Sequence, residues 1–537
     1  MFKARPMKKS FAIIIFFIAT IILTGCKKDL LNKVPLDTYS NSTLWTSAND
    51  ALTALNGCYS GWENGDHVIY YDCFTDNAYD QFPWEGYEPV AQGNATPTNL
   101  GAANRWSYIT IQRCNWFLAN VDKTPMADDL KSRMKGEARF LRAYQYFIMS
   151  QLYSDVPLII NNISIEHANL VTVTPRAEVT LFVLNELNTI SGMLPVNYPA
   201  ADAGRITRGA ALALAARVEL FNQKYTDCIA TCQQLMNSPF SYSLYPDYTN
   251  LFRPGFADNQ EEILDIQYLK TYNSFADLGV LVPNSKGGYS SVAVTQSLVD
   301  AYEMNTGKTI DDPSSKYNPV QPFINRDPRL DATILRPGAS WEGMYFDPLG
   351  ANSADYYLNN NCSPTGYISK KFISNLTTDF SNIWDCGLDF MVIRYAEVLL
   401  TYAEAKIEAG QIDQSVYDAI NKVRNRVNMP PVNQALYNNQ TSLRKLVRRE
   451  RRVEFGMEGL RWYDIQRWRI GDQVMPGKVY GTLKGSVDEY TGNLTLDPST
   501  RIQVGSPRAF NVNKNYLWPI PQKEIDLNKN LKQNADY

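Results

Sequence analysis

Aromatic side chains set among short polar ones are the residues of this chain with the clearest chemistry. The sequence contains 33 Tyr and 10 Trp, and aromatic residues make up 12% of it. Sugar rings have apolar C–H faces and polar edges, so a surface that binds them needs flat rings beside carboxylates, amides or guanidinium groups. That mixture occurs at residues 76–87 and again between residues 289 and 357. We interpret both stretches as candidate ligand-binding loops.

The two stretches differ in what else they could be. Residues 76–87 could instead be a loop that only caps the core. In the second stretch, Trp341 follows Gly338 in a turn-like setting and is the aromatic residue there to test first. The predicted ligand-binding residues are Asn77, Asp80, Trp84, Tyr87, Tyr289, Trp341 and Tyr345, with Tyr356 and Tyr357 as further candidates.

Catalytic chemistry has few candidates in this chain. His67 and His167 are the only histidines, which disfavours a Ser-His-Asp triad, a Cys-His pair or a multi-His metal site. A glycosidase needs only two carboxylates, and 55 acidic residues leave that reading open. Oxygen donors at residues 72–80 are close enough to suggest Ca²⁺, but the loop lacks the spacing of an EF-hand. We predict no catalytic residue, no metal site and no cofactor.

Charge argues against a nucleic-acid partner. The net charge is −3 and the isoelectric point is near 5.7. A basic run at residues 444–452 is interrupted by Glu450 and followed by Glu454 and Glu458, and it holds no interleaved aromatic residue. The pattern predicts ion pairs within a helix, at spacings of three and four residues.

The first residues have the proportions of a bacterial export signal. A basic start precedes an apolar run at residues 11–23, which is short for a permanent membrane span. The run ends in Leu23-Thr24-Gly25-Cys26, which resembles the lipobox of bacterial lipoproteins, whereas an ordinary cleavage site is the alternative. The resemblance implies a signal peptide at 1–25, acyl chains such as palmitate on Cys26, and a spacer at 26–42.

Two similar stretches predict a repeated pair of helices. The sequence from residue 215 resembles the sequence from residue 403: each has an alanine-rich first helix, a short polar turn and a second helix. Gly410 is placed to end one helix and Asp413 to begin the next. We predict a mostly α fold with tetratricopeptide-like helical pairs, although two unrelated hairpins would look similar.

Composition divides the chain into two regions. Residues 43–238 are predicted to be largely helical and to carry the first aromatic loop. The second region, 239–537, begins with a loop-rich part rich in Pro, Gly, Asn and Tyr, with short strands near residues 262–268 and 366–372. It is predicted to comprise that loop-rich part at 239–389, the helical repeat at 390–470 and a tail without long helices at 471–537.

Several motifs in one order resemble the SusD/RagB family of nutrient-binding outer-membrane lipoproteins. They lie behind the lipobox and cover most of the chain after Cys26. The motif RDPRL at residues 326–330 is interpreted as architectural, since Asp327 before Pro328 suits a turn. The others are GEARFLRAYQYF (136–147), LYSDVPLI (152–159), IRYAEVLLTYAEA (393–405), ERRVEFGMEGLRWYDIQRW (450–468) and YLWPIPQKEIDLN (516–528).

The resemblance implies a function and partners. It implies a lipid-anchored protein of the outer membrane, exposed at the cell surface, that captures oligosaccharides, or in some members peptides, without chemistry. It also implies a partner, a SusC-type TonB-dependent barrel that imports the ligand. Two other classes stay open at this point: a surface glycoside hydrolase, and a helical-repeat adaptor that binds only proteins.

Overall fold

The computed structural model describes residues 44–256 and 259–537. The predicted signal peptide, the lipidation site Cys26 and the spacer at 26–42 lie outside the described residues. Within these two ranges, every helix is too short or too polar to cross a membrane.

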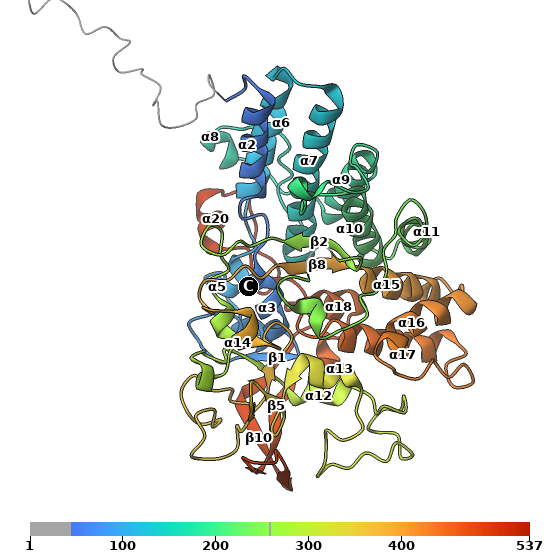
Figure 1. The fold of residues 1–537 in the computed structure, drawn as a ribbon. Helices are drawn as coiled ribbons and strands as arrows, with labels where there is room; N and C mark the ends of the chain where they lie inside the picture. The colour runs from blue at the N-terminus through green and yellow to red at the C-terminus, as the bar shows by residue number, and fades with distance from the viewer. Residues whose placement is uncertain (1–43, 257–258) are drawn as a thin grey trace, which may run out of the picture.

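Helices form an arc along one side of the molecule, in which each packs on the next except the last two, which both pack on α15 (Figure 1). The longest, α7, is buried over most of its length, which the apolar content of GEARFLRAYQYF explains. In chain order, the arc comprises α2 (Ala48–Tyr59), α6 (Ile109–Asn120), α7 (Asp128–Tyr153), α9 (Arg176–Ser191), α10 (Arg208–Phe221), α11 (Tyr225–Leu235), α15 (Tyr395–Glu408), α16 (Gln414–Arg426) and α17 (Gln440–Glu454).

The predicted helical pairs are confirmed. Helices α10 and α11 form one pair, α15 and α16 form the other, and α11 packs directly on α15. The loop-rich residues between these pairs therefore leave the stack unbroken. Gly410 follows α15 with a φ of +72°, where a side chain would be strained, and the Asp413 carboxylate caps α16 by accepting the Ser415 N–H.

Short strands and single-turn helices make up the loop-rich half. Strand β1 (Ala78–Asp80) comes from the first region, yet it pairs antiparallel with β3 (Val292–Val294) in a sheet of order β1-β3-β7-β4. The other strands here are β2 (Glu262–Ile266), paired with β8 (Phe390–Arg394), β4 (Ile334–Leu335), β5 (Ser340–Trp341), paired with β6 (Met344–Tyr345), and β7 (Ile368–Ser369). The short helices of the chain are α3 (Gly65–Tyr70), α4 (Glu88–Ala91), α5 (Leu100–Ala103), α8 (Ile165–Ala168), α12 (Gln296–Ala301), α13 (Pro328–Thr333), α14 (Leu376–Asp379), α18 (Arg461–Trp468), α19 (Gly471–Val474) and α20 (Gln522–Leu527).

The tail forms a long hairpin that the sequence analysis did not predict. Strands β9 (Gly477–Val487) and β10 (Leu494–Arg508) pair antiparallel, with irregular register along their length. The turn between them is closed by the Asp488 carboxylate, which accepts the N–H groups of Tyr490 and Thr491. One face of the hairpin packs with Leu349 in a small core of its own.

Ion pairs between elements, rather than within one helix, use the basic run of α17. The prediction of pairs at spacings of three and four was therefore wrong: Arg444 pairs with Glu408 of α15 at 2.5 Å, and Arg449 pairs with Glu303. Arg452 reaches Asp76 of the first aromatic loop at 2.9 Å. Because α17 packs on several elements, its arginines form ion pairs with carboxylates of those elements.

The RDPRL motif has the architectural position predicted for it. Asp327 caps α13, and Arg329 is fully buried between three carboxylates. Its guanidinium group pairs with Asp327 at 2.7 Å and with Glu450 and Glu454 at 3.1 Å each. The seven cysteines in the described ranges are all unbridged and buried.

Candidate ligand-binding site

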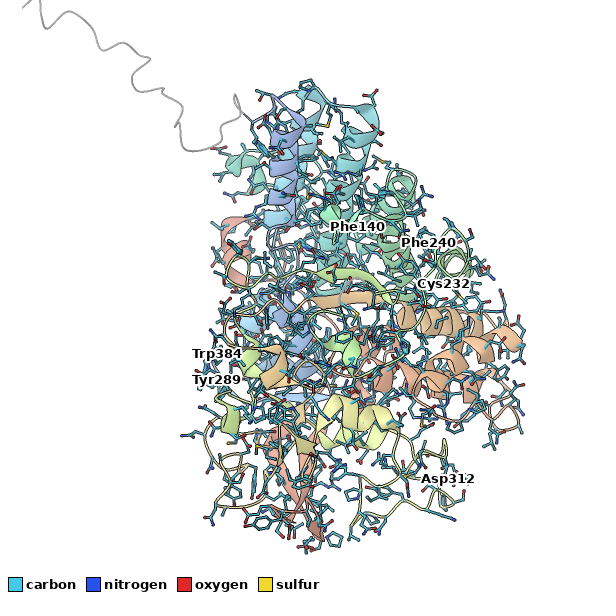
Figure 2. The ribbon with its side chains drawn as sticks, in the orientation of Figure 1. Phe140, Cys232, Phe240, Tyr289, Asp312 and Trp384 are labelled. Atoms are coloured by element: carbon cyan, nitrogen blue, oxygen red, sulfur yellow. The ribbon has the colours of Figure 1, made fainter. Side chains whose placement is uncertain are left out.

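Three exposed aromatic rings come from three separate segments of the loop-rich half. Trp84 exposes 73% of its surface, Tyr289 44% and Trp384 36%. Figure 2 shows Tyr289 and Trp384 close together at the edge of this half, away from the arc of helices, and their ring centroids are 5.0 Å apart. We call these three rings the aromatic surface.

Strand pairing holds the Trp84 loop beside the Tyr289 segment. Asp80 at the end of β1 is paired with Val292 at the start of β3. Beyond this pair, the Gln81 N–H donates to the Ser291 carbonyl at 3.0 Å, and the Gln81 side-chain amide donates to the Tyr289 carbonyl at 2.9 Å. Because these bonds continue the ladder, the loop that follows β1 lies against the segment that precedes β3.

The loop at residues 82–87 is shaped by a turn and by a close backbone approach. Phe82 and Trp84 stack with centroids 4.6 Å apart and ring planes 21° apart, so Phe82 supports the more exposed indole. The Glu85 N–H closes the turn on the Phe82 carbonyl at 3.0 Å. Gly86 then has a φ of +86°, and its carbonyl lies where a Cβ on Gly101 of α5 would stand. Two glycines thus let the loop rest directly on α5.

A third glycine determines the position of the Trp384 ring. A Cβ added to Gly279 would overlap the indole of Trp384, and the Gly279 carbonyl accepts the Tyr289 N–H at 2.9 Å. The backbone around Trp384 is turned by Asn382, whose side-chain oxygen accepts the Trp384 N–H at 3.0 Å. One glycine therefore contacts the Trp384 ring and the backbone of Tyr289.

Carboxyl groups and tyrosines lie behind the rings. The Tyr70 hydroxyl donates to Glu85 at 2.9 Å, and the Tyr70 ring stacks on Tyr87 at 4.5 Å. Asp80 is buried and accepts the N–H groups of Phe82 and Tyr87 at 3.2 and 3.0 Å. Burial raises the pKa of Asp80 to about 8, and the hydrogen bond and charge of Glu85 add to the shift.

The raised pKa of Asp80 predicts a pH-dependent stability. In the unfolded chain, the Asp80 carboxyl should lose its proton near the ordinary pKa of 3.8. In the folded protein it keeps the proton until about pH 8. The stabilisation linked to this proton is thus fully present below pH 3.8 and is lost as the pH rises through about 8. Asp80→Asn removes the titration, so its stability relative to wild type should increase between roughly pH 4 and pH 8. Urea unfolding at both pH values measures this, and a difference independent of pH would contradict it.

The structure separates the predicted site residues into exposed and buried ones. Trp84, Tyr87 and Tyr289 are exposed or half-exposed around the aromatic surface. Asn77 is buried and its amide is used internally, since it donates to Asp72 at 2.6 Å and accepts from Arg452 at 2.9 Å. Together with the bonds of Asp80, this makes both residues supports of the loop rather than groups that face a ligand.

Tyr289 is the one ring of the second predicted stretch that belongs to the aromatic surface. Trp341 is buried, and its indole N–H donates to the Ile373 carbonyl at 3.0 Å, so the ring has no face open to a ligand. This corrects its place as the first residue to test. Tyr345 is half-buried on β6 and lies over Gly492, in the turn of the β9–β10 hairpin. Tyr356 and Tyr357 pack edge to face with each other at 4.9 Å.

Trp384 was missed from the sequence, although a signal for it exists. It lies between Asn382 and Asp385, and the Asp385 carboxylate accepts the Thr271 N–H at 2.8 Å. Asn and Asp on either side of an aromatic residue favour an exposed turn. The same argument drew attention to Trp341, so local sequence alone does not rank the two.

The carboxyl groups near the surface do not have the geometry of a glycosidase. Asp80 and Glu85 are in direct hydrogen-bond contact, whereas hydrolases hold their two carboxyls roughly 5–10 Å apart across the substrate. The oxygen donors considered for Ca²⁺ are used by protein groups: Asp76 pairs with Arg461 at 2.8 Å as well as with Arg452, and Asp72 accepts the Gly459 N–H at 2.8 Å. This arrangement suits binding by stacking and hydrogen bonding.

Comparison with known proteins gives the chain a family. Residues 254–537 match the SusD family, and residues 36–220 match a SusD-like family described as starch-binding and associating with the outer membrane. A SusD-like protein of Formosa agariphila, P2, is 26% identical over 80% of this chain and 78% of its own length. The starch-binding protein SusD of Bacteroides thetaiotaomicron is 24% identical over 89% of this chain and 87% of its own.

The fold agrees with solved structures over nearly the whole chain. A SusD-like carbohydrate binding protein from Bacteroides fragilis superposes with a TM-score of 0.83 at 33% identity, covering 91% of this chain and 100% of the other. A second SusD-like protein from the same species has a TM-score of 0.79 at 27% identity, and covers 94% of this chain and 100% of its own. The chain described here belongs to the SusD family.

Proposed function

We propose that this protein binds oligosaccharides at the aromatic surface and holds them without cleaving them. The main support is that Tyr289 and Trp384 are exposed with ring centroids 5.0 Å apart, and that hydrogen bonds of Gln81 hold the loop of the exposed Trp84 against the Tyr289 segment. Half-exposed Gln81 lies beside the Tyr289 segment, where its amide oxygen can accept from a sugar hydroxyl while its amide nitrogen donates to the Tyr289 carbonyl. Stacked rings and a few hydrogen bonds give the moderate affinity that suits a protein that must release its ligand.

The family supports a role in nutrient uptake. Relatives are described as starch-binding or carbohydrate-binding, which favours a saccharide over a peptide here. We propose that the protein delivers its ligand to a SusC-type TonB-dependent barrel in the outer membrane. Affinity purification of the protein from its own membranes should recover such a barrel, and recovery of other proteins alone would favour the adaptor reading.

Calorimetric titration with neutral oligosaccharides and with peptides tests the binding role. We expect saturable binding of at least one oligosaccharide class, and unchanged ligand when the mixture is analysed afterwards. Release of shorter saccharides would show a hydrolase instead. Binding of peptides alone would show that the ligand is a peptide rather than a saccharide. Binding of neither would contradict the proposal.

Anchoring through Cys26 carries a prediction of its own. If acyl chains on this residue hold the protein to the membrane, Cys26→Ser should move it almost entirely from the membrane fraction to the soluble fraction. Incorporation of radiolabelled palmitate should be lost in the same variant. Labelling that persists in Cys26→Ser would show that the lipid is attached elsewhere.

A further inference from the structure

A cavity of about 530 Å³ lies between the start of α12, the end of α17 and the β9–β10 hairpin. Four cationic side chains line it, whereas the aromatic surface has none among the residues that define it. We call this cavity the cationic pocket. Its charged lining consists of Arg452, Lys478, Arg501 and Arg508, with Asp76 and Asp300 as the acidic members.

Two of the cations have no carboxylate partner. Lys478 is exposed on β9, and Arg501 is half-exposed on the facing strand β10. The Arg501 guanidinium donates to the Gly481 carbonyl at 3.1 Å. Within residues 44–256 and 259–537, no Asp or Glu oxygen lies within 4.0 Å of either side-chain cation. Their donors therefore remain available to a ligand.

The other two lining cations, Arg508 and Arg452, each form an ion pair with a carboxylate. Arg508 is balanced by Glu88 at 2.7 Å, but Arg452 and Arg461 share the single carboxylate of Asp76. Desolvation by burial lowers the pKa of Arg452 to about 10, so the guanidinium stays charged at neutral pH in a poorly hydrated place. Against these groups stands Asp300, which accepts from the Gln296 amide at 2.7 Å. The pocket lining thus holds four cations and two carboxylates.

The cationic pocket is separate from the aromatic surface. Both flank β3: Tyr289 precedes the strand, while Thr295 and Gln296 follow it and line the pocket. None of the three rings of the aromatic surface lines the pocket. Tyr480 and the Ser297 hydroxyl lie in the pocket wall, so a ring and neutral hydrogen-bonding groups accompany the charges.

We propose that the cationic pocket is a second saccharide site that takes a negatively charged substituent, the carboxylate of a uronic acid or a sulfate ester. A planar guanidinium group can donate two hydrogen bonds to the oxygens of either substituent. Arg501 and Lys478, which form no ion pair within the described residues, should contribute most to the binding free energy. The Tyr480 ring supplies a face for the sugar that carries the charge. This inference rests on the proposed function and adds to it a charge-selective contact that lies outside the aromatic surface.

Ligand pairs that differ only in charge test the proposal. The probes are oligogalacturonate against its methyl ester, and a sulfated galactan oligosaccharide against its desulfated form, each titrated at about 0.15 M salt. For at least one pair, we expect the charged form to bind roughly tenfold more tightly, the size of one charge-assisted contact. A preference in the galacturonate pair would indicate a carboxylate as the ligand group. A preference in the galactan pair would indicate a sulfate ester.

Charge-removing variants locate the effect. Arg501→Gln and Lys478→Gln change exposed or half-exposed side chains and should fold normally, which thermal unfolding checks. Each should reduce the preference for the charged form several-fold and leave binding of the neutral form unchanged. Lys523→Gln is the matched control, because Lys523 is an exposed lysine on α20, far from the hairpin in Figure 1. It should keep the full preference.

The outcomes separate this inference from the proposed function. If neutral and charged forms bind equally in both pairs, or if the preference survives both substitutions, the cationic pocket is not the site. Neutral binding in that case would still support the aromatic surface. If no saccharide binds in any form, both proposals are wrong.

Discussion

Replacing Arg394 with methionine should lower the free energy of unfolding by about 3–5 kcal/mol, the range observed when one partner of a buried ion pair is removed. The Arg394 guanidinium is buried and pairs with Glu261 and Glu454 at 2.7 Å each, and with Glu458 at 2.8 Å. Methionine fills a similar volume without the charge. The three buried carboxylates would then share fewer cations, and their desolvation would be poorly compensated.

The loss should depend on pH. Burial alone would raise the pKa of Glu454, but Arg426, Arg394 and Arg329 hold it well below its ordinary value of 4.5. Stabilisation from a depressed carboxyl pKa is present above about pH 4.5 and is lost as the pH falls through the folded pKa. Removing Arg394 weakens that depression. The difference between wild type and variant should therefore be smaller near pH 4 than near pH 7.

Denaturant unfolding at these two pH values measures both effects. The control is Arg444→Met on the same layer of helices, where a partly exposed guanidinium pairs with Glu408. That change should cost less than about 1 kcal/mol, because exposed ion pairs contribute little. A loss as small for Arg394→Met would mean that the buried cluster is not a stabilising anchor.

Arg394 connects stability to the candidate site. It ends β8 and joins the loop-rich insertion to Glu454 at the end of α17. Trp384 lies in the loop just before that strand. The buried ion pairs of Arg394 therefore hold the strand that follows the Trp384 loop. The motifs that identified the family, ERRVEF and RDPRL, supply Glu450, Glu454 and Arg329 to this cluster. Their use in buried ion pairs agrees with their interpretation as architecture.

Helices were predictable because their signals are local. Apolar periodicity, the caps at Asp413 and Thr207 and the stop at Gly410 act within a few residues of one another. The counter-charges of α17 were not predictable, because Glu303, Glu408 and Asp76 are remote in sequence. The β9–β10 hairpin was missed although Ile502 and Val504 alternate and Gly492 marks a turn. Irregularities in the strand pairing interrupt the alternation of apolar and polar residues, so each apolar stretch is short.

The ligand residues were only half predictable for a related reason. Trp84, Trp341 and Trp384 all occur in turn-like sequences, and tertiary packing alone decides which of them is covered. Trp341 meets the Ile373 carbonyl from another segment, while Gly279 leaves room for Trp384 at the surface. Neither neighbour is near its tryptophan in sequence. Composition could therefore indicate an aromatic binding surface but could not name all its members.

Trp84→Ala and Trp384→Ala should each weaken oligosaccharide binding by about 1–3 kcal/mol, which is roughly 5- to 150-fold in Kd. Both rings are exposed, so their removal takes away stacking area with little loss of core packing. If one ligand spans both rings, the double variant should lose more than either single variant. Titration with whichever neutral oligosaccharide binds the wild type measures the loss.

The matched control is Tyr490→Ala, which removes a ring that is 81% exposed at the tip of the β9–β10 hairpin. It should bind the neutral oligosaccharide as the wild type does, since exposure alone does not make a ring part of the site. Trp341→Ala, in contrast, should lower stability by about 3–5 kcal/mol, because it empties a buried position. Equal binding by wild type, Trp84→Ala and Trp384→Ala would place the ligand elsewhere on the protein. A loss confined to the two exposed tryptophans would assign recognition to the loop that follows β1 and the loop that precedes β8.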